Sequence, residues 1–425
     1  MPLPPAAARI QRTYLVLTFL ATFAASIIRG IDALFLIDAG LSASEVFAVY
    51  AFMTVGTVLF EIPTGAVADI KGRRRSYLIG AFALAAGTFF YWYLWNIGAG
   101  FIWFAAATFA FGIAFTFFSG ATEAWLVDAL DATGYTGELE DVFARSQIAL
   151  GAAMLSGTLL GGLLAQVTNL GVPYLVRAVL LLVTFAVAFR AMHDLGFEPH
   201  STGSLVKAVG QTTRDSIQYG WNVTPVRWMT LAGAFTFATM GFIFYAMQPY
   251  LLELYGDSEA YLVASVAATI VAGAQMVGGM TSGAVRRRFT SRTSLITVLT
   301  VIGAGLVALI GLAGNFWAAI GALVLWSVVF AVVMPVRQAF LNAQIDSRHR
   351  ATVLSVDSLV GSSGSIPASP TLGRVADIYG YGPAFLVAAV VQIGAVPFLA
   401  RARVTCPTHT DQIELEPGAA AAAGG

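Results

Sequence analysis

Two long stretches of this chain contain no charged residue, and each is interrupted near its middle by small or polar residues. The first covers residues 76–122 and is broken at 96–100, and the second covers residues 293–336 and is broken at Gly314 and Asn315. A helix needs about 20 mainly apolar residues to cross the hydrocarbon core of a bilayer. Each stretch therefore predicts two membrane helices joined by a short turn.

A basic cluster precedes each of these stretches, at residues 71–75 in the first case and 286–292 in the second. Because the same order of elements occurs twice, the sequence predicts a duplication. The fold class expected is an all-α membrane protein with twelve transmembrane helices in two pseudo-symmetric six-helix bundles. The predicted spans are residues 13–37, 45–67, 76–96, 100–128, 145–168, 172–191, 228–252, 259–285, 293–313, 316–340, 351–373 and 380–400.

The domain organisation follows from these spans. An N-terminal six-helix bundle is expected at 1–192 and a C-terminal six-helix bundle at 228–403. The polar segment 193–227 is expected to be a cytoplasmic linker, in which residues 205–219 have the pattern of an amphipathic helix. Residues 404–425 are expected to form a disordered cytoplasmic tail.

The lysines and arginines indicate the orientation of the chain. Almost all of them fall in loops and tails on one side of the predicted spans, whereas Arg374 falls on the other side and Arg29 and Arg177 lie within spans. Cytoplasmic loops carry the excess of Lys and Arg. The sequence therefore predicts a multi-pass protein of the cell inner (plasma) membrane with both termini in the cytoplasm. Arg177, near the outer end of the sixth span, is interpreted as an interfacial residue.

Composition supports a membrane protein and excludes several other classes. The chain is 58% hydrophobic and 11% charged, with a mean hydropathy of +0.77, whereas soluble domains carry roughly 25% charged residues. A formal net charge of +0 argues against nucleic acid as a partner. No histidine or cysteine lies in a predicted span, so we expect no metal, no cofactor and no intramembrane enzyme. The protein is expected to be a monomer.

A motif with glycines, an aspartate and arginines follows the second predicted span. In the segment 65–75, Gly72 permits a tight turn, and the arginines suit the anionic inner leaflet. The segment resembles the G-x-x-x-D-x-x-G-R-R/K signature of the major facilitator superfamily, and residues 61–64 resemble the lead-in of a bacterial subset. The resemblance implies a transporter whose two bundles rock around a central cavity lined by the first, fourth, seventh and tenth spans.

The same resemblance implies a latch on the cytoplasmic side, in which the signature aspartate and arginine act with an acidic residue at the end of the fourth span. The second half has Gly283 where the repeated aspartate would stand, so the latch should be lopsided. Asp357 and Arg337 lie near the inner ends of their spans and are interpreted as gate residues. The residues expected at the cytoplasmic gate are Gly65, Asp69, Gly72, Arg73, Arg74, Asp128, Arg337 and Asp357.

Ionisable groups within a span cost about 2.5–3.5 kcal/mol to insert, so each requires a reason. Glu123, Asp32 and Glu61 are candidates for proton coupling, because a partly desolvated carboxylate can exchange a proton as a cavity alternates. The alternatives are an ion pair or hydrogen bond to a neighbouring span for Glu123, and the signature's charge network for Glu61. Arg29 shares a helix face with Asp32, and the two residues are expected to pair or to contact substrate.

Three further residues are candidates for contact with a small-molecule substrate. Tyr245 and Gln248 lie on the predicted seventh span, and Trp326 lies on the tenth, and both spans line the cavity in the resembled family. A buried glutamine amide needs hydrogen-bond partners, which a substrate could supply.

Residues 153–162 partly match a string that marks many proton-driven exporters, G-x-x-x-G-P-x-x-G-G. The three later glycines are present, but Ala153 and Thr158 replace the first glycine and the proline. No G-x-x-x-x-G-K-[ST] string occurs, so an ion gradient must supply the energy. We expect a secondary active transporter working by alternating access, resembling bacterial drug/proton antiporters and performing proton-coupled export of small amphipathic compounds (multidrug-type efflux). The alternative is a proton-coupled importer or a facilitator of a specific small metabolite.

Overall fold

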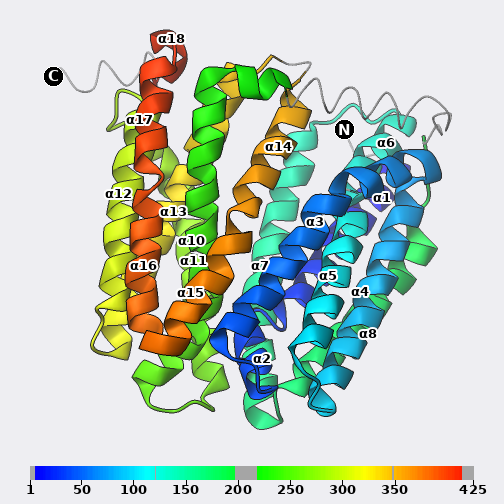
Figure 1. The fold of residues 1–425 in the computed structure, drawn as a ribbon. Helices are drawn as coiled ribbons and strands as arrows, with labels where there is room; N and C mark the ends of the chain where they lie inside the picture. Colours follow the sequence, from blue (N-terminus) through cyan, green and yellow to red (C-terminus); the bar gives the residue numbers. More distant parts are fainter. Residues whose placement is uncertain (1–4, 120, 197–217, 347–348, 414–425) are drawn as a thin grey trace. The chain divides into compact units, whose positions relative to one another are not determined.

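The computed structural model describes residues 5–119, 121–196, 218–346 and 349–413, and this part of the chain is almost entirely helical (Figure 1). The helices are α1 (Pro5–Ser26), α2 (Asp32–Asp38), α3 (Ala43–Lys71), α4 (Arg73–Asn96), α5 (Phe101–Phe118), α6 (Ala121–Ala132), α7 (Leu139–Val167), α8 (Gly171–Ala191), α10 (Thr224–Tyr255), α11 (Tyr261–Arg286), α12 (Arg292–Gly311), α13 (Phe316–Gln344), α14 (Arg350–Ser363), α15 (Ser365–Tyr379), α16 (Tyr381–Ile393), α17 (Val396–Thr405) and α18 (Thr408–Asp411).

In the described part of the chain, ten helical segments are long and apolar enough to cross a membrane. Two of these segments join neighbouring helices, α5 with α6 and α16 with α17. The first and eleventh spans are each divided into two shorter helices, α1 with α2 and α14 with α15. The predicted all-α fold with twelve spans is confirmed, and the structure adds the divisions within the first, fourth, eleventh and twelfth spans.

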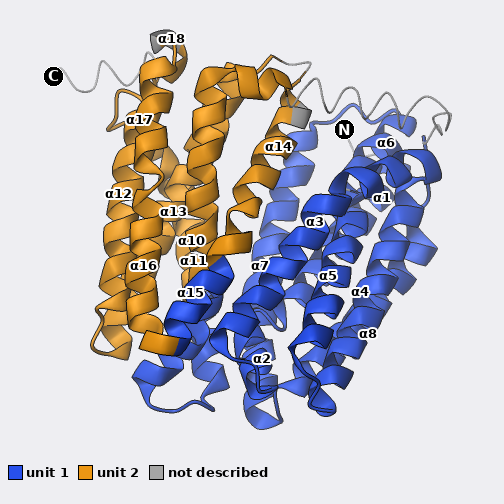
Figure 2. Ribbon diagram, viewed as in Figure 1, with its two compact units in different colours: residues 1–210, 244–269, 369–377 blue, residues 211–243, 270–368, 378–425 orange. Residues whose placement is uncertain are grey.

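The chain forms two compact units (Figure 2). Unit 1 comprises residues 1–210, 244–269 and 369–377, and unit 2 comprises residues 211–243, 270–368 and 378–425. Unit 1 therefore contains the first six spans together with parts of α10, α11 and α15. The division of the sequence into bundles at 1–192 and 228–403 stays a prediction.

Close glycine contacts between the second and fourth spans recur between the eighth and tenth. In unit 1, a Cβ at Gly56 of α3 would overlap the carbonyl oxygen of Phe109 on α5, and in unit 2 a Cβ at Gly278 of α11 would overlap the carbonyl oxygen of Val328 on α13. Small residues allow membrane helices to approach at backbone distance. Equivalent pairs of spans in the two halves therefore have the same kind of close glycine contact, as expected for a duplicated fold.

A second pair of glycine contacts follows the same rule. The carbonyl oxygen of Ile27 in the first span would meet a Cβ at Gly161 of α7, the fifth span, within unit 1. In unit 2, the carbonyl oxygen of Ala234 in the seventh span would meet a Cβ at Gly364 of the eleventh. Gly161 is one of the glycines that match the exporter string, and in this structure it serves helix packing.

We expect Gly56→Ala to destabilise the folded protein by about 1–3 kcal/mol, because the added methyl would displace a backbone carbonyl that cannot rotate away. The matched control is Gly65→Ala on the same helix, where a Cβ would meet no described atom within 4 Å. The thermal unfolding midpoint in detergent should fall for the first variant and not for the second. Equal midpoints for the two variants would contradict the packing argument.

The end of the chain packs more closely than the sequence predicted. Residues after Arg403 continue α17 to Thr405 and form α18, and the carboxylate of Asp411 accepts hydrogen bonds from the backbone N–H (2.9 Å) and the hydroxyl (2.6 Å) of Thr293. Burial raises the pKa of the nearby Cys406 thiol. The prediction of a disordered tail is therefore wrong for residues 404–413, while 414–425 and most of the predicted amphipathic helix at 205–219 lie outside the described residues.

Candidate functional site

The first span is interrupted between α1 and α2, at residues 27–31. The segment contains three isoleucines and Gly30, which all favour helix less than alanine does. Its backbone hydrogen bonds tighten from the i−4 to the i−3 pattern, since Arg29 N–H donates to the carbonyl of Ser26 and Ile31 N–H to that of Ile28. Such a break leaves backbone groups without a partner in the helix.

The side chain of Gln248 on α10 supplies the missing partners. Its Oε1 accepts a hydrogen bond from the backbone N–H of Ala33 at 3.0 Å, and its Nε2 donates to the carbonyl of Arg29 at 3.0 Å. These two backbone groups are four residues apart, so in a regular helix they would bond to each other. The Gln248 amide lies between these two backbone groups, and Gln248 is 1% exposed. In this structure both polar ends of the amide are engaged by backbone.

Two glycines bring the break close to α11. A Cβ at Gly30 in the break, or at Gly162 on α7, would overlap the side chain of Ser265 on α11. The hydroxyl of Ser265 has no hydrogen-bond partner among the described residues. The break in the first span therefore lies within unit 1 against residues of the seventh and eighth spans.

Asp32 begins α2 directly after the break and is half-buried. Its Oδ1 accepts a short hydrogen bond of 2.5 Å from the hydroxyl of Tyr174 on α8, and its charge interacts with Arg177 one turn further along the same helix. The hydroxyl of Tyr50 interacts electrostatically with the same carboxylate but makes no hydrogen bond to the described residues. A hydrogen-bond donor and a nearby cation favour the charged form of a carboxylate, whereas burial favours its neutral form, so small rearrangements of these neighbours can shift the balance between the two.

Aromatic rings enclose this carboxylate. Tyr50 stacks on Tyr245 of α10 with ring centroids 3.5 Å apart, and Phe35 stacks on Tyr174 at 3.8 Å. Tyr91 accepts a hydrogen bond at its hydroxyl from Thr108 at 3.0 Å. Tyr245, which the sequence assigned to substrate contact, therefore lies in the wall around Asp32.

The predicted substrate residues do not form one cluster. Arg29 is exposed, its guanidinium lies 5.6 Å from the centre of the Phe244 ring, and no salt bridge joins it to Asp32 within the described chain. Trp326 is 2% exposed and stacks on Phe330 in unit 2. Arg29, Tyr245 and Gln248 all belong to unit 1, where Gln248 binds the break itself.

The signature residues lie around the turn from α3 to α4. Gly72 joins the two helices at φ +99°, a conformation that favours glycine. Arg73 forms a salt bridge with Asp69 at 2.5 Å and reaches Asp128 of α6 at 3.9 Å. The structure thus brings together the aspartate, the arginine and the fourth-span acid that the sequence assigned to the latch, whereas a Cβ at Gly65 would meet no described atom within 4 Å.

Asp194, which the sequence analysis did not single out, completes this turn. Its Oδ1 accepts a hydrogen bond from the backbone N–H of Arg74 at 2.9 Å, at the start of α4. Arg74 in turn donates to the carbonyl of Phe189 at 2.6 Å and lies over the ring of that residue. Only one feature of the sequence indicated this contact, an acidic residue shortly after the sixth span. The partner of Asp194 lies 120 positions away, so the pairing itself could not be predicted.

The two remaining carboxylates have fewer contacts. Glu61 on α3 is half-buried and Glu123 on α6 is exposed, and neither side-chain carboxylate forms a hydrogen bond or salt bridge with the described residues. Glu123 interacts electrostatically with Tyr14 of α1. Their assignment to proton coupling stays a prediction.

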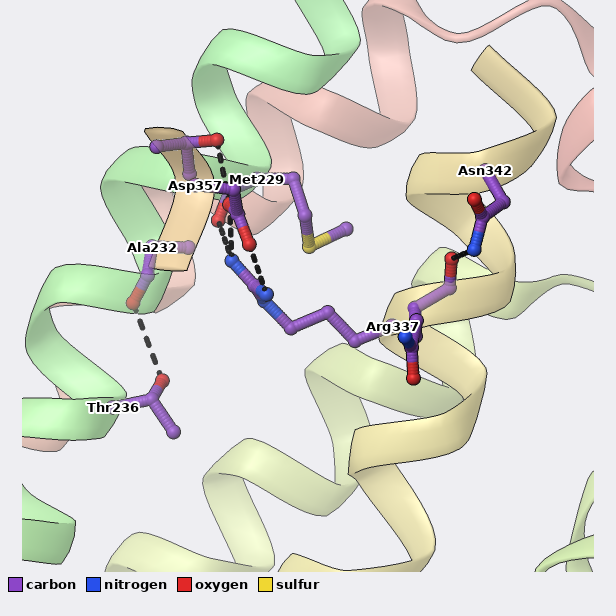
Figure 3. Close-up of polar contacts among 8 residues, drawn as sticks. Met229, Ala232, Thr236, Arg337, Asn342 and Asp357 are labelled. Carbon is purple, nitrogen blue, oxygen red and sulfur yellow. Dashed lines mark hydrogen bonds and ion pairs between the residues drawn. The ribbon is translucent and has the colours of Figure 1, made fainter. Parts of the chain in front are cut away.

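A buried ion pair lies in unit 2, where α10, α13 and α14 meet (Figure 3). Arg337 donates from both terminal nitrogens to the carboxylate of Asp357, at 2.7 Å each. The hydroxyl of Thr230 donates to the same carboxylate at 2.7 Å, and Arg337 also reaches the carbonyl of Met229 at 3.3 Å. The side chains are 10% and 5% exposed. The two residues assigned to the gate therefore pair with each other inside one unit.

No group of three or more His, Cys, Asp or Glu side chains that could hold a metal ion occurs in the described ranges. The arrangement instead offers hydrogen bonds across a broken membrane helix and a half-buried carboxylate beside it.

Comparisons with known proteins agree with this fold. The structure is similar to a mutant of the nucleoside transporter NupG, with a TM-score of 0.79 and 13% identity over 92% of this chain and 99% of that one. It is also similar to a bacterial homolog of the human lysosomal transporter Spinster in an inward-facing and occupied conformation (TM-score 0.71, 13% identity, 97% and 100% covered) and to a D-xylose–proton symporter (TM-score 0.70, 14% identity, 96% and 100% covered).

A search of curated protein sequences gave no match. At identities of 13–14%, the structural likenesses establish the fold alone. A family model described as Major Facilitator Superfamily matches residues 14–369, which is most of the sequence. The chain therefore belongs to the major facilitator superfamily, a family of multi-pass membrane transporters.

Proposed function

We propose that the protein is a secondary active transporter that exports small amphipathic compounds in exchange for protons. The observation that carries the proposal is Asp32, a half-buried carboxylate at the break of a membrane helix, bonded to Tyr174 and close to Arg177. Discontinuous helices of secondary transporters form ion and substrate sites. The partners of this transporter are its substrate, protons and the lipid bilayer.

The alternative function is proton-coupled import, or facilitated transport, of a specific metabolite. The similar structures are named as nucleoside, D-xylose–proton and Spinster-like transporters, so their names favour no direction and no single substrate. We propose that the protein is a monomer of the plasma membrane. The distribution of lysine and arginine supports the proposed placement of both termini in the cytoplasm.

Under alternating access, the hydrogen bonds at the helix break would hold residues of the two halves of the sequence together in one conformation. Gln248 belongs to the second half of the sequence and Arg29 and Ala33 to the first, yet they are hydrogen-bonded within unit 1. Asp377 makes a similar link, because its carboxylate accepts hydrogen bonds from the N–H groups of Ala43 (2.7 Å) and Ser44 (3.1 Å) at the start of α3. In alternating access, these hydrogen bonds must break when the first and second halves of the chain separate near the helix break and the start of α3.

Asp32→Asn is expected to abolish proton-driven transport, because asparagine cannot carry the exchanged proton. The test is accumulation of a panel of cationic and anionic fluorescent dyes in cells lacking their own pumps, with and without a protonophore. Wild type should exclude at least one dye in a protonophore-sensitive manner, and Asp32→Asn should behave like empty cells. Glu123→Gln, measured in parallel, tests the second predicted coupling residue.

The control is Asp131→Asn, which changes an exposed carboxylate on α6 and should exclude dye as wild type does. Coupling that survives in Asp32→Asn would contradict the assignment of the proton to this residue. Absence of dye exclusion by well-expressed wild type would favour the alternative function and call for uptake assays with nucleosides and pentoses.

Asp69→Asn is expected to lower turnover by up to about fivefold while leaving membrane insertion intact. The pair of Asp69 with Arg73 is partly exposed, with 44% and 25% of the side chains accessible, and such pairs are worth up to about 1 kcal/mol. Initial transport rates and the amount of protein in the membrane measure the two effects. Loss of insertion, or full turnover, would show that the pair does not act as a latch.

A further inference from the structure

The segment that follows the twelfth span folds back onto the start of the ninth span, α12. The carboxylate of Asp411, a residue that is 7% exposed, accepts hydrogen bonds from the backbone N–H and the hydroxyl of Thr293, the second residue of α12. Arg292, the first residue of α12, donates to the carbonyl of Thr410 at 2.9 Å. Both residues that begin α12 are therefore bound by this segment.

The same segment also binds the end of the tenth span, α13. Gln344 is the last residue of α13, and its Nε2 donates to the hydroxyl of Thr410 at 2.7 Å and to the sulfur of Cys406 at 3.0 Å. All these residues belong to unit 2. Residues 406–413, which we call the tail clasp, therefore join the ends of the ninth, tenth and twelfth spans.

The first half of the chain has an equivalent arrangement after the sixth span, within unit 1. Asp194 accepts a hydrogen bond at 2.9 Å from the backbone N–H of Arg74, the second residue of α4, as Asp411 does from the second residue of α12. The indole N–H of Trp125, in the fourth span, donates to the carbonyl of His193 at 2.7 Å. In each half, an acid after the last span thus binds the start of the third, and the residue before that acid is bound by the fourth.

The repetition of this arrangement follows the duplication of the chain. The two acids are separated by almost the same number of residues as the two N–H groups that they bind. The turn before α12 also has Gly283 where the signature aspartate would stand, and no salt bridge occurs at this turn among the described residues. The tail clasp therefore supplies the acidic partner at this turn.

We propose that the tail clasp is a conformational device that holds the ends of the ninth, tenth and twelfth spans together, with Asp411 as its central residue. All its partners lie in the second half of the sequence, so alternating access can proceed without breaking it, unlike the hydrogen bonds that Gln248 and Asp377 make with the first half. The inference goes beyond the proposed function, because it applies to any substrate and to either direction of transport.

The test is the rate at which N-ethylmaleimide alkylates Cys406 in the purified full chain. This residue is the only cysteine of the sequence, and its half-buried sulfur accepts a hydrogen bond from Gln344. Burial raises the pKa of the thiol, and the thiolate is the form that reacts. Alkylation therefore reports local opening of the tail clasp. The folded wild type should react at least about tenfold more slowly than the denatured chain.

Matched variants locate the effect. Asp411→Ala should raise the alkylation rate at least about tenfold, because hydrogen bonds to a charged acceptor are lost. Thr293→Val, which keeps the shape of the side chain and removes one donor, should raise it less. Gln412→Ala changes an exposed side chain of the same segment and should leave the rate unchanged. An unchanged rate in Asp411→Ala, or a wild type that reacts as fast as the denatured chain, would overturn the proposal.

A second reporter separates local opening from unfolding. Ser327 on α13 is 0% exposed, so Ser327→Cys should stay unlabelled in all these variants. If Asp411→Ala exposes this reporter, the milder Thr293→Val variant decides the question. In that variant, faster alkylation of Cys406 with Ser327→Cys still protected would support the proposal, and an unchanged rate would overturn it.

The equivalence of the two halves has its own test. Met192, just before Asp194, is 0% exposed, so Met192→Cys in a Cys406→Ser background is the matching reporter in the first half. Asp194→Ala should accelerate its alkylation as Asp411→Ala accelerates that of Cys406, and acceleration in one half alone would overturn the equivalence. These measurements need no transport, so the tail clasp and the proposed function can each fail while the other stands.

Discussion

Asp357→Leu alone is expected to destabilise the folded protein by about 3–5 kcal/mol, because it leaves the guanidinium of Arg337 buried without its counter-ion. The pair is bidentate, with two contacts of 2.7 Å, and its side chains are 10% and 5% exposed. Thr230 would lose its acceptor at the same time. Unfolding in detergent by heat or by a denaturing surfactant measures the effect.

The double variant Arg337→Met with Asp357→Leu should recover most of the lost stability, since a buried ion pair can be replaced by apolar residues of similar volume at little cost. Asp69→Asn is the matched control, because it breaks a pair that is partly exposed and should cost at most about 1 kcal/mol. A single variant as stable as the control, or a double variant as unstable as the single, would contradict the argument.

Gln248→Met is expected to shift the protein away from the conformation described here. Methionine fills a similar volume but cannot bond the N–H of Ala33 or the carbonyl of Arg29, and each unsatisfied backbone group costs about 1–3 kcal/mol. The two groups can bond to each other only if the break closes into regular helix. The substitution therefore favours any state in which the first span is continuous and separated from α10.

The distance between spin labels at Ile97→Cys and Ser258→Cys, in a Cys406→Ser background, reports this shift. Both positions are exposed and belong to unit 1, one in each half of the sequence. Gln248→Met should broaden the distribution towards longer distances. Gln275→Met is the matched control, because the Nε2 of Gln275 has no hydrogen-bond partner among the described residues. Identical distributions for the two variants would refute the role of Gln248.

Features with a local cause were predictable from the sequence. Uncharged stretches predicted membrane helices, and Gly72 predicted the turn at which α3 meets α4, because hydrophobicity and backbone conformation are properties of short segments. The family resemblance predicted that Asp128 lies close to Arg73. The spans and the surroundings of the signature could therefore be predicted before the structure.

Features that depend on distant partners were not predictable. The break at residues 27–31 is stabilised by Gln248, which lies more than 200 positions away and which the sequence assigned to substrate. Arg177 was placed at the interface, but it interacts with Asp32 because α8 brings Tyr174 and Arg177 to the same side. A single sequence carries no signal for such pairings when the partners are common residue types.

The helix break also constrains how the protein is made. Synthesis proceeds from the N-terminus at about 5–20 residues per second, so Arg29 and Ala33 leave the ribosome long before Gln248. Until then no amide is available for their backbone groups, and in lipid an unsatisfied group costs several kcal/mol. The first span should therefore enter the bilayer as a continuous helix and acquire its break only after the seventh span has been inserted.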